Sequence, residues 1–135
     1  MITYRPATEA DSDLVFGAWM RKHKVTLRMG DFINNSSYYE SLRLHIATLL
    51  AAHGALVAEA EGAALGFIVA SDAGVVHWLH VKPEFRRLGI GTELVRIAMS
   101  TRGAARIEFA SPTPFIRTVR DKITKETYYN PFAGA

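Results

Sequence analysis

The sequence predicts a single α/β domain over residues 1–135, built on a central sheet with flanking helices. Three observations support this prediction. Residues 86–91 form a glycine-containing turn between a strand-like and a helix-like segment. Apolar runs of strand length occur alongside segments in which apolar residues recur at helical spacing. The 135 residues, 49% hydrophobic and 21% charged, suit one globular core.

The N-terminal segment predicts a strand followed by an amphipathic helix. Residues 2–6 form the expected strand. Thr8 or Asp11 can cap the helix, because their side-chain oxygens accept bonds from the first free backbone N–H groups. The basic run at residues 21–24 suits the negative end of the helix dipole. The apolar stripe of this helix consists of Leu14, Val15, Ala18 and Trp19.

A second helix is expected after a loop. Gly30, Asp31 and the polar residues 34–36 mark the loop. Ser36 or Ser37 then caps the helix, and Gly54 ends it. Its apolar stripe consists of Tyr39, Leu42, Ile46, Leu49 and Leu50.

The middle of the chain predicts three consecutive strands. Residues 55–60 and 65–70 form a hairpin around Glu61 and Gly62, and a short turn leads to a strand at residues 75–81. Strict alternation on this third strand places two sets of side chains on opposite faces. One set is Val75, His77, Leu79 and Val81; the other is Val76, Trp78, His80 and Lys82.

The C-terminal part predicts a helix to about Thr101 and a strand at residues 106–110. Pro112 and Pro114 restrict the backbone after this strand, so a short helix is expected at residues 115–122. A single strand within residues 123–129 then completes the predicted elements.

The turn at residues 86–91 has the chemistry of an anion site. Gly89 and Gly91 let the backbone turn sharply and expose its N–H groups. The following helix adds a partly positive N-terminus, and Arg86 and Arg87 add cationic forks that fit phosphate oxygens. The simpler alternative is a tight turn with solvated arginines. Two glycines with two arginines at one strand–helix junction favour a pyrophosphate site.

The spacing of the glycines in the turn can be compared with that of known pyrophosphate-binding motifs. A P-loop needs Lys-Ser/Thr after its second glycine, whereas Thr92 and Glu93 follow Gly91. A dinucleotide site needs three glycines and a later acidic residue. The pattern Arg86-x-x-Gly89-x-Gly91 instead resembles the acyl-CoA-binding motif of the GCN5-related N-acetyltransferase (GNAT) family.

The resemblance covers about residues 1–110 and implies a GNAT fold, with a mixed, mostly antiparallel sheet and one splayed strand pair. The C-terminal part is shorter than is usual in that family, and the ends of the chain also resemble small phage-encoded members. The implied co-substrate is acetyl-CoA. Backbone groups of Leu79 and Val81 would bind its pantetheine arm, with the Val81 N–H polarising the thioester. The other implied cofactor-binding residues are Arg86, Arg87, Leu88, Gly89, Ile90, Gly91 and Thr92.

The activity implied by the resemblance is direct transfer of an acetyl group to a primary amine. The chain has no cysteine to carry an acyl group and no His-Glu-x-x-His metal motif, so neither a cysteine thioester nor a metal is expected. Two alternatives stay open. One is a phage-type enzyme that modifies a nucleic-acid base, and the other is an acyl-CoA-binding module without turnover.

Two residues are candidates for proton transfer. His77 lies four residues before Val81, where some aralkylamine acetyltransferases carry a histidine, and an imidazole can accept a proton near neutral pH. His77 as a buried structural histidine is the alternative. Many family members protonate the coenzyme thiolate with a helix tyrosine, but residues 114–122 contain none. Tyr128 is the remaining candidate acid, provided that the tail folds over the site, and packing is its alternative role.

The distribution of basic residues bears on whether the protein binds nucleic acid. The net charge of +3 is mildly basic. Residues 21–24 together with Arg117, Arg120, Lys122 and Lys125 would give a basic rim for nucleic acid, and solvated surface is the alternative. No apolar run is long enough to cross a bilayer. The absence of cysteine fits a cytoplasmic protein. We expect a monomer or homodimer, with a small-molecule or protein amine as acceptor.

Overall fold

The computed structural model describes residues 1–26, 35–100, 106–111, 115–123 and 126–130. The loop expected around Gly30 and Asp31 lies outside these residues, as do Pro112, Pro114 and Lys125. Within the described part of the chain, no helix is both long and apolar enough to cross a membrane.

The described elements follow the order expected from the sequence. Each helix and strand was anticipated, apart from two short 3-10 turns. In chain order they are β1 (Thr3–Pro6), η1 (Glu9–Asp11), α1 (Ser12–Thr26), α2 (Asn35–His53), β2 (Leu56–Ala60), β3 (Ala63–Ala70), β4 (Val75–Val81), η3 (Pro83–Phe85), α3 (Ile90–Ser100), β5 (Arg106–Phe109), α4 (Phe115–Lys122) and β6 (Glu126–Tyr129).

The strands form one sheet in the order β1-β2-β3-β4-β5-β6. The first four strands pair antiparallel, whereas β4–β5 and β5–β6 pair parallel. The hairpin turn between β2 and β3 has positive φ at Glu61 (52°) and Gly62 (78°), as a two-residue hairpin turn requires. The mixed, mostly antiparallel sheet is therefore confirmed.

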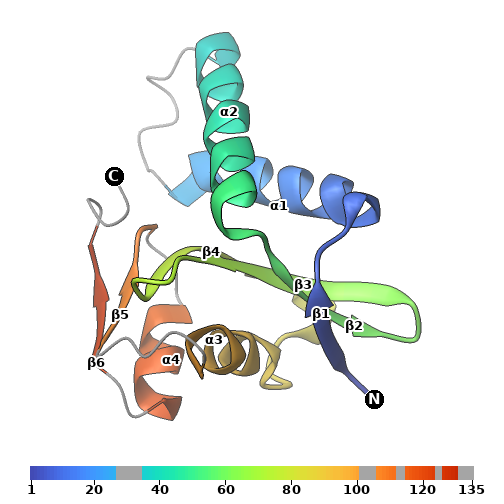
Figure 1. The fold of residues 1–135 in the computed structure, drawn as a ribbon, viewed down its shortest axis with the longest axis vertical. Helices are drawn as coiled ribbons and strands as arrows, with labels where there is room; N and C mark the ends of the chain where they lie inside the picture. The colour runs from blue at the N-terminus through green and yellow to red at the C-terminus, as the bar shows by residue number, and fades with distance from the viewer. Residues whose placement is uncertain (27–34, 101–105, 112–114, 124–125, 131–135) are drawn as a thin grey trace.

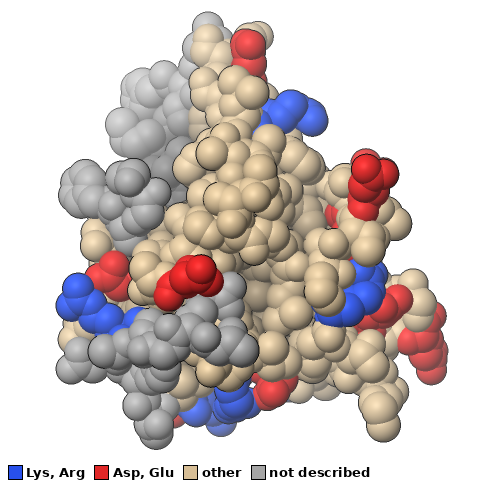
Figure 2. Space-filling view, viewed as in Figure 1, with Lys and Arg blue, Asp and Glu red and all other residues tan. Residues whose placement is uncertain are grey.

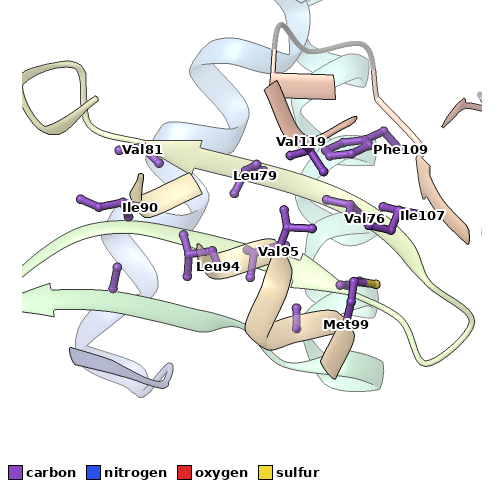
Figure 3. Packing of buried hydrophobic residues seen from close by; sticks show 14 of the residues in the cluster. Val76, Leu79, Val81, Ile90, Leu94, Val95, Met99, Ile107, Phe109 and Val119 are labelled. Carbon is purple, nitrogen blue, oxygen red and sulfur yellow. The ribbon is translucent and has the colours of Figure 1, made fainter. Parts of the chain in front are cut away.

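The helices cover both faces of the sheet (Figure 1). Helices α1 and α2 pack on one face, with Trp19 and Ile46 fully buried there. Helices α3 and α4 lie on the other face, since each connects two neighbouring parallel strands and right-handed crossovers of this kind place their helices on the same side. Figure 3 shows this second core, where α3 contributes Leu94 and Val95 and α4 contributes Val119.

The start of α2 corrects two details of the sequence prediction. The helix begins at Asn35, so Ser36 and Ser37 lie inside it rather than at its cap. This phase places Tyr38 in line with the buried Leu42 and Ile46, and Tyr38 packs against the core. Tyr39, expected in the apolar stripe, is 38% exposed instead.

A β-bulge in β4 corrects the expected alternation of side chains. On β3, Val69 pairs with Trp78 and Ala70 pairs with Val76, which leaves His77 as the extra residue. A bulge reverses the in-and-out alternation beyond it. Val76 and Leu79 accordingly both pack in the core under α3, whereas Trp78 packs under α1 and α2.

The same bulge changes the orientation of both strand histidines. His77 stacks on His53 at the end of α2, so its side chain lies on the α1/α2 face with that of Trp78. His80 contacts Phe67, which also belongs to the α1/α2 core. The expectation that His77 and His80 face opposite sides was therefore wrong, because it assumed an unbroken strand.

Strands β4 and β5 separate shortly after they meet. Among the described residues they pair only at Val75–Glu108 and Val76–Phe109. The Ala110 N–H donates to the Val76 carbonyl, and the Ser111 hydroxyl donates to the His77 carbonyl at 3.3 Å. The splayed strand pair expected from the sequence is thus present, and its closed end, the fork, lies at His77.

Candidate coenzyme site and reaction centre

The glycine turn connects η3 to α3 through two backbone conformations of the left-handed region. Arg87 has a φ of 67° and Gly89 a φ of 81°. The Glu93 N–H donates to the Gly89 carbonyl at 3.0 Å, which closes the first bond of the helix. The N–H groups of residues 90–92 lie in the first turn, where the helix offers them no carbonyl to donate to, so they point out of the helix N-terminus. The turn therefore presents backbone donors to an anion.

A cavity of about 70 Å³ opens over these donors. Six of the seven residues expected in the turn line it. Leu88 does not, and its side chain is 63% exposed. The complete lining is Val81, Phe85, Arg86, Arg87, Gly89, Ile90, Gly91, Thr92 and Thr118.

Two of these lining residues had not been singled out as site residues. Phe85 ends η3, the short connector that leads into the turn. Thr118 comes from α4, which packs beside α3 and so reaches the cavity from a distant part of the chain. No local sequence signal marks Thr118, because only the packing of two helices brings it there.

The charges around the cavity favour an anion. Arg86 and Arg87 are exposed at its edge. Glu93 in the first turn of α3 would oppose an anion, but it is paired with Arg96 one turn along the helix. The Arg86 Nε donates to the Val81 carbonyl at 3.0 Å, which connects the turn to the end of β4.

The backbone N–H groups of Leu79 and Val81 on β4 face the opening beside β5, whereas the Val81 carbonyl already accepts from Arg86 Nε. The Lys82 N–H donates to the Leu65 carbonyl on β3 at 2.9 Å. Because antiparallel partners alternate, His80 and Trp78 likewise direct their backbone groups toward β3. Leu79 and Val81 therefore direct theirs toward β5, where the strands have separated. Their side chains are buried under α3, which holds this backbone in place.

His77 is buried at the fork, with 4% of its surface exposed. Its ring stacks on that of His53 with 5.4 Å between centroids and 11° between planes. Its Nε2 atom is buried and has no hydrogen-bond partner among the described residues. Burial, with a smaller contribution from His53 and His45, lowers the pKa of His77 to about 4. The imidazole is therefore neutral at neutral pH and has a nitrogen available.

Tyr128 lies apart from this group. It is on β6, at the far edge of the sheet, and pairs with Glu108 of β5. Its ring is 47% exposed and lies under the Arg106 guanidinium at 5.8 Å. Strand β5 thus stands between Tyr128 and the opening beside β4. Among the described residues, no group of three or more histidine or acidic side chains is arranged to hold a metal ion.

The two buried histidines should make the stability of the fold depend on pH. Burial lowers the pKa of His80 to about 4 as well, with added repulsion from Arg86, Lys22, Arg21 and Lys82. Their ordinary value is 6.5, so between pH 6.5 and pH 4 the unfolded chain binds more protons than the folded chain. Stability is then fully present above pH 6.5 and decreases as the pH falls toward 4.

We expect the loss to reach on the order of 2 kcal/mol for each histidine. Thermal unfolding followed by circular dichroism at several pH values measures it, and His80→Gln should remove about half of the dependence. The Asp11 carboxyl contributes little in this range, because both its ordinary pKa of 3.8 and its pKa in the folded protein, which the hydrogen bond with Arg5 lowers to about 2, lie below pH 4. A Tm that stays constant between pH 7 and pH 4.5 would contradict this expectation.

A sheet that opens beside a glycine turn at a helix N-terminus defines an α/β protein built to hold a nucleotide coenzyme. The acetyltransferase (GNAT) domain model matches residues 51–128. The chain therefore belongs to the GNAT acetyltransferase family, as the sequence motif indicated. A search of curated proteins found no match.

Solved structures with the same fold come from several organisms. A Pyrococcus furiosus protein assigned as an acetyl transferase is 19% identical with a TM-score of 0.63, over 91% of this chain and 92% of that one. A GNAT family acetyltransferase from Brucella melitensis, in complex with acetyl-CoA, is 21% identical with a TM-score of 0.55, over 87% and 80%. A ribosomal-protein-alanine N-acetyltransferase from Brucella melitensis biovar Abortus is 19% identical with a TM-score of 0.58, over 91% and 90%. At these identities the likeness concerns the fold.

Proposed function

We propose that the protein is an N-acetyltransferase that transfers an acetyl group directly from acetyl-CoA to a primary amine. The observation that carries this proposal is the continuity between the glycine turn and the opened strand. Val81 belongs to both, since it lines the turn cavity and its backbone N–H faces the opening. The family membership and the acetyl-CoA complex of the Brucella melitensis relative support acetyl-CoA as the co-substrate.

The coenzyme would lie along β4 with its pyrophosphate at the turn. The N–H groups of residues 90–92 would bind the phosphate oxygens, and Arg86 and Arg87 would neutralise their charge. The pantetheine arm would then follow the backbone of Val81 and Leu79 toward the fork. Four residues of strand span about 13 Å, so an extended arm that passes Val81 comes close to His77.

This path assigns the thioester to the part of β4 near the fork. Val81 lies at the turn, so its N–H would meet the pantetheine arm. Leu79 is two residues closer to His77, and we therefore assign the polarisation of the thioester carbonyl to its N–H in place of the Val81 N–H that the resemblance implied. A fixed backbone donor acts there on the negative charge that develops in the tetrahedral intermediate.

The reaction would need only positioning and one proton acceptor. The amine nitrogen attacks the thioester carbon, a C–N bond forms and the C–S bond breaks. The amine proton passes to His77 Nε2, directly or through water, and the coenzyme leaves as a thiolate that takes a proton from solvent. Because His77 is neutral and its Nε2 is not engaged by the described residues, it can accept this proton.

The alternative of nucleic acid as the acceptor receives less support. Helices α1 and α4, which carry most of the basic residues expected to form the rim, lie on opposite faces of the sheet (Figure 1), and Lys125 lies outside the described residues. On the face in Figure 2, basic and acidic side chains are interspersed. The other alternative, an acyl-CoA-binding module without turnover, is separated from an enzyme by the acetyl-transfer assay.

The direct test offers acetyl-CoA and a panel of amines to the protein. Acetyl transfer is measured as the release of free CoA. We expect CoA release that requires both an amine and acetyl-CoA, together with a product heavier by one acetyl group in mass spectrometry. The panel would contain aromatic amines, benzylamine, spermidine, an alanine-terminated peptide and a single-stranded oligonucleotide. Tight coenzyme binding with no product from any amine would identify a binding module and overturn the proposal.

A further inference from the structure

The bulge in β4 brings two unpaired ring nitrogens to the same face of the sheet. His77 Nε2 and Trp78 Nε1 belong to consecutive residues, which on an unbroken strand would point to opposite faces. Here both side chains lie under α1 and α2. Both nitrogens are buried, and neither has a hydrogen-bond partner among the described residues. Buried polar atoms without partners are uncommon, and each one calls for an explanation.

Aromatic rings continue from this pair toward the surface. Trp78 stacks on Trp19 with 5.6 Å between centroids and 9° between planes, and the His23 ring lies 6.0 Å from Trp78. The Tyr38 hydroxyl shares a 2.5 Å hydrogen bond with His23 Nδ1. The exposed Tyr39 meets Tyr38 edge to face at 5.1 Å. We call these five rings the aromatic cluster, and its flat apolar surfaces suit a flat ligand.

The charges near the cluster do not suit a cation. The ionisable groups that shift the pKa values of His23, His77 and Tyr38 are His45, His53 and Tyr39. No carboxylate is among them, so these described groups offer a buried ammonium no partner of opposite charge. A neutral histidine with a lowered pKa is also a weak base, which suits an amine that is already neutral at neutral pH. The amino group of an aromatic amine has this property, because its lone pair is delocalised into the ring, whereas the amino group of an alkylamine is protonated.

The two unpaired nitrogens specify which polar groups the ligand carries. An indole N–H can only donate, so Trp78 needs an acceptor atom. His77 Nε2, as the atom that receives the amine proton, needs an N–H donor. A ligand that satisfies both has an amino group beside an atom with a lone pair.

We propose that the acceptor is a small planar aromatic amine whose amino group is adjacent to a ring nitrogen, as in 2-aminopyridine. The amino N–H donates to His77 Nε2, and Trp78 Nε1–H donates to the ring nitrogen. This inference rests on the proposed function and specifies its substrate class. It also gives the bulge a role, since the extra residue places both ring nitrogens on the α1/α2 face of the sheet.

The test compares 2-aminopyridine with 3-aminopyridine, whose ring nitrogen is not adjacent to the amine, by kcat/KM for CoA release at a pH at which both ring nitrogens are unprotonated. The variants are Trp78→Phe, which keeps an aromatic ring but removes the N–H, and Trp19→Phe, which makes the same change in the other ring of the stack. Intrinsic amine reactivity is identical for all three proteins. We therefore compare the ratio of the two kcat/KM values between proteins.

We expect the ratio to fall by about three- to tenfold in Trp78→Phe, the effect of one lost hydrogen bond, and to stay within about twofold in Trp19→Phe. An unchanged ratio in Trp78→Phe would overturn the assignment. Faster turnover of benzylamine, spermidine or the oligonucleotide than of 2-aminopyridine would overturn the substrate class and leave the N-acetyltransferase proposal intact. Absence of any acetyl transfer would overturn both.

Discussion

Replacing Gly89 with glutamate is expected to abolish acetyl-CoA binding. Gly89 has a φ of 81°, a conformation that side-chain-bearing residues adopt only at a cost of about 1 kcal/mol or more. A Cβ would meet nothing within 4 Å, so the glutamate side chain would fit sterically beside the cavity. Its negative charge would then lie at the helix N-terminus, where the pyrophosphate is expected, and would repel it.

Gly62 provides a matched control for this substitution. It also has a positive φ, 78°, and a Cβ there would likewise meet nothing within 4 Å. It lies in the hairpin between β2 and β3, away from the turn cavity. Gly62→Glu should therefore lose a similar amount of stability while keeping its affinity for the coenzyme. Calorimetric titration of both variants separates the two effects, and unchanged affinity in Gly89→Glu would refute the assignment of the site.

Replacing His77 with alanine is expected to lower kcat by about 100-fold to 10,000-fold, the usual range when a general base is removed. Coenzyme affinity should change little, because the imidazole lies at the fork rather than at the turn. Steady-state kinetics beside coenzyme titration measure the two quantities. Loss of kcat with intact affinity identifies a group that acts on the reacting atoms.

His80 is the control for this substitution, because it lies on the same strand, is as deeply buried and also has a pKa lowered to about 4. His80→Ala should lose stability but retain most of its kcat. His77→Gln covers the case in which the alanine variant unfolds, since glutamine fills more of the space and is not a base. A folded His77→Gln protein with full kcat would show that His77 is not the general base and has only a structural role.

The sequence predicted the order of the elements well, because the signals for that order are local. Hydrophobic spacing identified the helices and strands. Gly54 and Gly62 marked a helix end and a hairpin, because glycine readily adopts the positive φ that both positions have in the structure. The glycine turn between Arg86 and Gly91 was recognisable for the same reason. Its residues are contiguous, so the cavity lining could be anticipated almost completely.

The features that escaped sequence reasoning depend on contacts between distant segments. The bulge at His77 arises where β4 pairs with β3 on one side and leaves β5 on the other, and no residue type marks it. Tyr38, rather than the expected Tyr39, packs against the core, because the helix starts at Asn35. Thr118 reaches the cavity only because α4 packs on α3. Each of these details is set by register or packing rather than by local pattern.

In the proposed complex, the coenzyme lies along the glycine turn and the opened side of β4. The most direct measurement is the change in backbone amide NMR shifts during titration with acetyl-CoA. We expect the largest shifts for Leu79, Val81 and residues 87–92, with the β2–β3 hairpin at residues 60–63 unaffected. Saturable binding that leaves the amides of residues 87–92 unchanged would contradict it.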